Sequence, residues 1–163
     1  MAEVPSREEL IRQGDELWAA LWAKLGVLSD EQLEQPGASG PQWSGKNVLG
    51  HIAHWHDHAA EVIRDIVEGR EPDSRSNYDE WNARWFDEDA ALTSAEVREY
   101  CERSRGALRS YLLGLSEQQW AESTWDAPDG STWHIHGTAD VNMNEHYREH
   151  LDELAESGWS PAG

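Results

Sequence analysis

The sequence has only one cysteine, Cys101, in 163 residues. A single cysteine cannot form an internal disulfide, which is typical of proteins in a reducing compartment. Cys101 lies in the helix-like stretch REYCERSRGAL without a nearby histidine, which argues against a catalytic nucleophile. The start, MAEVPSREEL, lacks the features of a signal peptide, and no apolar run approaches the roughly 20 residues of a membrane-spanning helix. We therefore expect a soluble, cytoplasmic protein without a membrane partner.

Positive charge is also scarce. Thirteen Lys and Arg residues stand against thirty-two Asp and Glu residues, which gives a formal net charge of −19. Such a surface repels phosphate groups, so we expect no nucleic-acid partner and no binding to anionic membranes. The charges are interspersed along the chain rather than gathered in a single-sign tail, so no disordered charged arm is indicated. A small molecule is the expected partner.

Hydrophobic residues make up only 38% of the chain, with one Phe but ten Trp. Much of the buried surface must therefore come from large rings that each carry one polar N–H group. We expect most of these Trp residues to fill the core, and a Trp-lined pocket is the alternative. The length suits one domain with a single core, spanning residues 1–163.

Hydrophobic spacing and helix-start signals predict four long helices. Ser6 with Glu9 and Thr93 with Glu96 have the spacing of capping boxes, and Ser44 is placed to cap another helix. The long helices are expected at about residues 7–28, 45–68, 94–113 and 138–157, with a short helix at about 78–89. No strand alternation is convincing, and even STWHIH is too short to start a sheet. The sequence thus predicts an all-α four-helix bundle with a short extra helix between the second and third long helices.

Two parts of the chain resemble each other. LGVLSDEQLEQ at 25–35 and LLGLSEQQWAE at 112–122 both end a long predicted helix. Each is followed by a loop with Pro and Gly, a Trp (Trp43 or Trp133) and a helix that carries histidines. Either the two halves are structurally equivalent, or Leu-Ser-Asp/Glu is simply a common helix junction, and the sequence leaves both open.

The motif NEHYREHLDEL places His146 and His150 four residues apart on the last predicted helix. At about 100° per residue, His150 falls on the apolar face of that helix, and His146 lies at its edge. Two neutral imidazoles at this spacing can bind one divalent ion. Alternatively, they are core histidines that hydrogen-bond to neighbouring groups.

A third ligand would complete the usual catalytic arrangement of three protein ligands and one open position. The segment HIAHWHDH offers His51, His54, His56 and His58. His54 projects furthest from the apolar face of its helix, so we expect it at the surface. The other three lie near the boundary of that face, with a slight preference for His56. Periodicity alone does not choose among them.

The motifs PQWSGKNVLGHIAHW and, about ninety residues later, NEHYREHL resemble the DinB-like superfamily, which includes mycothiol-dependent maleylpyruvate isomerases and ClbS/DfsB-type bundle proteins. The resemblance implies that His51, His146 and His150 bind a divalent cation, with Zn or Ni expected, in a cavity at one end of the bundle. In the isomerase branch the first residue of the last pair is Glu, so His146 places this chain nearer the three-histidine members. Trp55 would wall the substrate pocket. His58 would be a proton shuttle, or else an exposed or helix-stabilising histidine.

The resemblance implies a metal-dependent enzyme for stress or detoxification. It would be an S-transferase for a low-molecular-weight thiol such as mycothiol, or a hydrolase, with a thiolate or a metal-bound water as the nucleophile. The alternative is a non-catalytic binding or self-resistance protein that sequesters a reactive compound, with the metal structural or absent. A third possibility, an oligomerisation module, needs an apolar seam that the last helix lacks. A homodimer is compatible with the resemblance.

Overall fold

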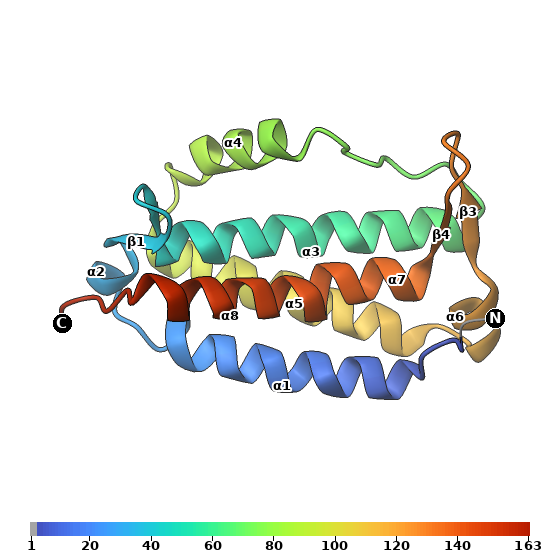
Figure 1. The fold of residues 1–163 in the computed structure, drawn as a ribbon, viewed down its shortest axis with the longest axis horizontal. Coiled ribbons are helices and arrows are strands. Elements are labelled where there is room, and N and C mark those ends of the chain that lie inside the picture. The colour runs from blue at the N-terminus through green and yellow to red at the C-terminus, as the bar shows by residue number, and fades with distance from the viewer. Residues whose placement is uncertain (1–2) are drawn as a thin grey trace.

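Four long helical segments lie side by side in the computed structural model, which describes residues 3–163 (Figure 1). The prediction of an all-α bundle is therefore confirmed. The fourth segment is continuous but contains one π-helical turn, η1. The segments are α1 (Arg7–Leu25), α3 (Gly45–Val67), α5 (Ser94–Gly114), and the run α7 (Ile135–Asp140), η1 (Val141–Glu145) and α8 (His146–Ser157).

The predicted extra helix is α4 (Tyr78–Asp89), which packs on the outside of α3. The chain direction in Figure 1 shows that α1 and α3 are antiparallel, whereas α3 and α5 run the same way. The segment that joins the end of α3 to the start of α5, which contains α4, runs back along the length of the bundle. The bundle thus has one long crossover connection, and α4 covers a face of α3 that would otherwise meet solvent.

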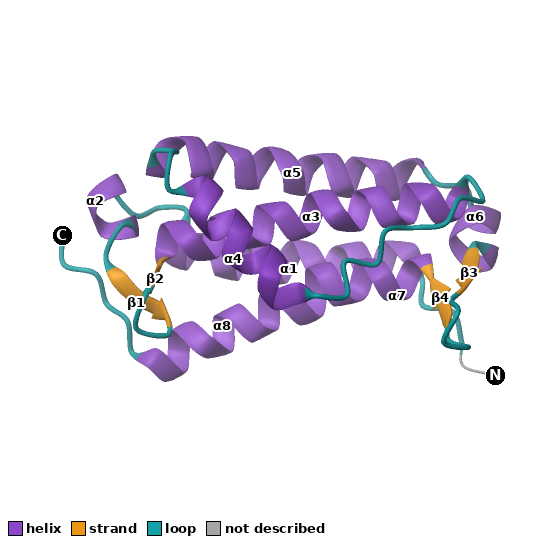
Figure 2. Cartoon of the chain, turned by 90° about the horizontal axis from the view of Figure 1, so that it is seen from above, coloured by secondary structure: helices purple, strands orange, loops and turns teal. Residues whose placement is uncertain are grey.

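The two halves of the chain repeat one order of elements, which favours their structural equivalence. After α1 and α5 come the short helices α2 (Asp30–Leu33) and α6 (Glu117–Glu122), each begun by a Ser-Gln capping box. A two-stranded antiparallel hairpin follows each, and then a long helical segment. The hairpins lie at opposite ends of the bundle (Figure 2). They are formed by β1 (Pro36–Ser39) with β2 (Trp43–Ser44), and by β3 (Thr124–Asp126) with β4 (Thr132–His134).

The expectation of no strands was therefore wrong, and STWHIH itself contains β4. Strands of two to four residues are too short for side-chain alternation to show in a sequence. Two helix boundaries also differ from the prediction. α1 ends at Leu25, because Gly26 and Val27 turn the chain toward Ser29 and leave Val27 71% exposed. The last helical segment starts at residue 135, three residues before the predicted start.

The predicted helix caps mostly form. Thr93 and Glu96 make a complete capping box, with each side chain accepting from the backbone N–H of the other residue. Ser44 caps α3 in the same way with Asn47. At the start of α1 the box is half formed, because Ser6 accepts from the Glu9 N–H but the reciprocal bond is absent between these described residues.

The core lies between the four helical segments, where α3 packs most extensively on α5. Trp55, Trp85 and Trp120 are buried, and most other Trp side chains pack half-buried against this core. The role of Trp as core filler is therefore confirmed for most of the ten. None of the described helices is long and apolar enough to cross a membrane.

Candidate metal centre and cavity

Three histidines from two helices converge on one point. The Nε2 atom of His146 lies 2.8 Å from Nε2 of His51 and 2.9 Å from Nε2 of His150. One ligand atom from each residue lies within 4.8 Å of the others. The structure thus brings together the three residues that the family resemblance selected and leaves His56 and His58 outside the cluster. That the cluster binds a metal stays a prediction.

The π-helical turn η1 ends at Glu145, directly before His146. A π turn adds a residue to the helix, so the face of α8 is rotated relative to α7. A regular wheel, which left His146 at the edge of the apolar face, does not include this rotation. Buried Asn144 anchors the turn, because its Nδ2 donates to Leu10 O at 3.3 Å and to Asp140 Oδ1 at 2.9 Å. Single π turns are frequent at functional sites.

His150 is held by a residue that the sequence analysis did not select. Its Nδ1 lies 2.9 Å from Glu153 Oε2, and Ser39 Oγ donates to the same oxygen at 2.9 Å. Because an ionised carboxylate only accepts, Nδ1 carries the proton and Nε2 keeps its lone pair. Glu153 follows His150 by three residues, a spacing at which side chains on a helix meet, and this spacing was the signal for the contact.

Burial keeps the imidazoles of His51 and His146 neutral. It lowers the pKa of His51 to about 3, with the nearby His150 as the next cause, and lowers the pKa of His146 well below its usual value. Nδ1 of His51 forms no hydrogen bond of standard geometry among the described residues, yet the adjacent Asn82 amide opposes the fall of this pKa. Neutral imidazoles are the form that binds metals, so the donor set fits a divalent cation.

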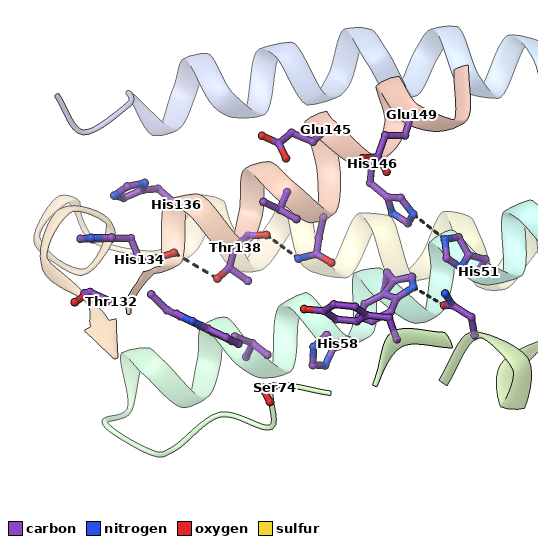
Figure 3. Close-up of a pocket in the computed structure, with 18 residues that line it drawn as sticks. His51, His58, Ser74, Thr132, His134, His136, Thr138, Glu145, His146 and Glu149 are labelled. Atoms are coloured by element: carbon purple, nitrogen blue, oxygen red, sulfur yellow. Dashed lines mark hydrogen bonds between the residues drawn. The ribbon is translucent and has the colours of Figure 1, made fainter. Parts of the chain in front are cut away.

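His51 and His146 form part of the wall of a cavity of about 700 Å³. Figure 3 shows them at one end of the labelled lining residues, with His134 and His136 at the other. Trp55 and His58 also line the cavity, and their role in a substrate pocket stays a prediction. No Lys or Arg is among the described lining residues. The remaining lining residues belong to α3, to α4 and the segment before it, to β4 and to the α7–η1–α8 run. They are Val62, Ser74, Tyr78, Asn82, Thr132, Trp133, Gly137, Thr138, Val141, Asn142, Glu145 and Glu149.

His56 is a core residue, with Nδ1 3.1 Å from Ser104 Oγ and Nε2 2.6 Å from the Tyr147 hydroxyl. Ser104 Oγ also lies 3.0 Å from the Cys101 carbonyl, which only accepts. The bonds therefore run one way: Tyr147 donates to His56, His56 to Ser104, and Ser104 to Cys101. The network explains why His56, which the wheel slightly favoured as a ligand, does not join the cluster.

His54 is not a surface residue, contrary to the sequence expectation. Its ring stacks on Trp85 with centroids 4.8 Å apart, and its Nε2 lies 3.0 Å from Oδ1 of buried Asp89. Both partners belong to α4, which covers the side of α3 that the wheel assigned to solvent. A wheel describes one helix and gives no sign of a second helix on its outer face.

Similar solved structures share the fold at low sequence identity. The colibactin self-resistance protein ClbS, in complex with double-stranded DNA, is 14% identical with a TM-score of 0.79, and the match covers 98% of this chain and all of that one. YfiT from Bacillus subtilis, described as a probable metal-dependent hydrolase, is 18% identical with a TM-score of 0.69. That match covers 98% of this chain and 94% of YfiT. A mycothiol-dependent maleylpyruvate isomerase is 14% identical with a TM-score of 0.76, covering 94% of this chain and 63% of the isomerase.

The DNA in the ClbS complex means that the comparisons do not support the expectation of no nucleic-acid partner. No curated protein matches this chain. A family model described as the DinB superfamily matches residues 13–154, which is most of the sequence. The chain belongs to the DinB superfamily.

Proposed function

We propose that this chain is a metal-dependent DinB-like protein that acts on a small organic molecule, as a thiol S-transferase or as a hydrolase. The observation that carries the proposal is the convergence of three Nε2 atoms, two of them from residues that line a cavity large enough for a substrate. His51, His146 and His150 would hold a divalent cation such as Zn or Ni. Imidazole suits several divalent metals, so the ligand set does not select one.

A cation held there would supply Lewis acidity, which lowers the pKa of a water or thiol that it coordinates. The protein supplies the setting for that chemistry. Glu153 and Ser39 fix the orientation of His150, and ligands that are all neutral imidazoles would bring no negative charge to the cation. Trp55, Tyr78 and Trp133 give the cavity apolar surface, which excludes water from a bound substrate.

The second candidate is sequestration without catalysis. The cavity is lined by aromatic rings, and buried Cys101 is the only cysteine, so this chain offers no accessible thiol of its own for covalent capture. A reactive compound could be shielded in such a cavity with the metal structural or absent. ClbS, a self-resistance protein of the same fold, makes this reading worth testing.

A thermal-shift screen separates these functions. Protein loaded with zinc and protein stripped by a chelator are each mixed with cysteine, glutathione and mycothiol, and the shift in Tm is compared. A thiol that raises the Tm of the zinc-loaded form alone supports S-transfer. If no thiol does so, release of product from activated esters and amides tests hydrolysis. Equal behaviour of the loaded and stripped proteins in both assays contradicts the metal-dependent proposal and favours sequestration.

A further inference from the structure

His58 is a buried histidine that lacks the partners its neighbours have. It lies on α3 two turns after His51 and lines the cavity, with only 5% of its surface exposed. Its Nδ1 is buried and has no hydrogen-bond partner among residues 3–163. Buried polar groups in folded proteins are nearly always hydrogen-bonded, so the missing partner of His58 requires an explanation.

The same helix shows that the fold can satisfy buried histidines. Both ring nitrogens of His56 have side-chain partners, and so do both nitrogens of His54. Both nitrogens of His150 on α8 are also engaged. His58 differs from these three in lining the cavity. Its Nδ1 is closed off from the cavity, so the ring nitrogen that a molecule in the cavity would engage is Nε2, which also has no hydrogen-bond partner among residues 3–163.

The surroundings of His58 indicate the chemistry of that molecule. The Trp55 ring meets His58 edge-on, with centroids 5.2 Å apart, and Tyr78 meets Trp55 at 5.5 Å. Tyr78 and Val141 border the cavity and are 54% and 53% exposed, so they offer apolar surface to an incoming ligand. None of the described Lys or Arg residues lines the cavity, and Arg75, whose charge acts on His58, is already ion-paired with Glu61 and Asp73. A carboxylate or phosphate in the cavity would therefore compete with these acidic partners for the only nearby cation among the described residues.

We infer that His58 is a specificity-determining residue, which forms a hydrogen bond with a flat, apolar ligand that bears a hydroxyl or amino group and no anionic group. Trp55, Tyr78 and Val141 contact the apolar body of this ligand, while the imidazole binds its polar group. The inference names the substrate class for the cavity of the proposed function. It does not depend on the metal, because His58 lies outside the three-histidine cluster.

The test compares p-cresol with p-xylene, which differ by a hydroxyl in place of one methyl group. Dissociation constants are measured by NMR titration of the purified protein, as isolated and after chelator treatment. We expect p-cresol to bind at least fivefold more tightly than p-xylene in both preparations. His58→Phe, which keeps a ring but removes both nitrogens, should abolish this preference and leave p-xylene binding within about twofold. His134→Phe alters a cavity histidine at the far end and should retain the preference.

Binding should also shift the imidazole ¹⁵N signals of His58 in the wild-type protein, so the test remains decisive if His58→Phe does not fold. The inference is overturned if p-xylene binds as well as p-cresol, if the preference survives His58→Phe, or if neither compound perturbs His58. A failure of the metal proposal looks different, because the protein would then lack metal while still showing the p-cresol preference.

Discussion

His150 and Glu153 are joined by a hydrogen bond of 2.9 Å between Nδ1 and Oε2, one turn apart on α8. The bond fixes the tautomer of His150 and aims its Nε2 at His51 and His146. Removal of such an outer partner commonly lowers metal affinity by about 10- to 100-fold. We predict a loss of this size for Glu153→Ala, measured by competition with a chromophoric chelator.

Glu156→Ala is the matched control, since it removes the same charge from an exposed position on α8. The metal affinity of this control should remain within about twofold of wild type, because a distant surface charge is screened by salt. Equal losses in the two variants would mean that overall charge, and not the orientation of His150, sets the affinity.

Gly50 and Gly106 should respond in opposite directions to replacement by alanine. A Cβ on Gly50 would lie 2.2 Å from Oδ2 of Asp89, whose carboxylate is held against His54. Gly50→Ala should therefore lower the free energy of unfolding by about 1–3 kcal/mol through overpacking. Gly106 on α5 has open space around it, so Gly106→Ala should raise that free energy by about 0.5–1 kcal/mol. Urea denaturation measures both, and a Gly50→Ala variant as stable as the wild type would refute the close packing of α4 on α3.

Stability should fall in acid because of His56. Burial lowers its pKa from 6.5 to about 3, so the unfolded chain takes up a proton that the folded protein refuses. This contribution to stability is fully present above about pH 6.5 and is lost toward pH 3, at up to about 1.4 kcal/mol per pH unit. Urea denaturation of chelator-treated protein should show the free energy of unfolding falling as the pH is lowered from 6.5 to 4.5.

In His56→Phe the free energy of unfolding should change less steeply with pH, by up to about 1.4 kcal/mol per pH unit, whatever the absolute stability of the variant. His51 and His58, with pKa values lowered to about 3 and about 4, add to the slope of both proteins. An NMR titration that finds the His56 ring protonating near pH 6.5 in the folded protein would contradict the burial of a neutral imidazole.

Cys101 should be inert in the folded protein. Its side chain is fully buried on α5, and burial raises the pKa of its thiol. Only the thiolate is nucleophilic, so a disulfide reagent such as dithiobis(nitrobenzoate) should modify native protein at least 100-fold more slowly than unfolded protein. Fast modification of the native protein would place Cys101 at an accessible site and reopen its role as a nucleophile.

The bundle and its boundaries could be predicted largely from local signals. Helical spacing of apolar residues identified each long helix, and Thr93 with Glu96 marked the start of α5 to the residue. The strands and the π turn could not be predicted in this way. β2 and β4 are too short to alternate, and the π turn before His146 is stabilised by a tertiary bond from Asn144 to α1.

The candidate site was predictable only in part, because one of its three histidines is selected by contacts between helices. Spacing identified the inward pair His146 and His150, but the choice of His51 over His56 depends on which helices face α3. His56 meets Tyr147 and Ser104, whereas His51 meets His146 across the helix interface. These contacts join residues far apart in the chain, so the family resemblance was needed to select His51 from the sequence.

The most direct test of the proposed metal centre is the metal content of protein purified without a nickel column, measured by mass spectrometry. We predict about one equivalent of a divalent transition metal in the wild type and in His134→Ala, whose histidine is exposed and outside the cluster. His51→Ala, His146→Ala and His150→Ala should each retain less than about a tenth of that amount, because three ligands are the usual minimum for a stable site. A wild-type protein without stoichiometric metal, or variants that retain it in full, would contradict the account.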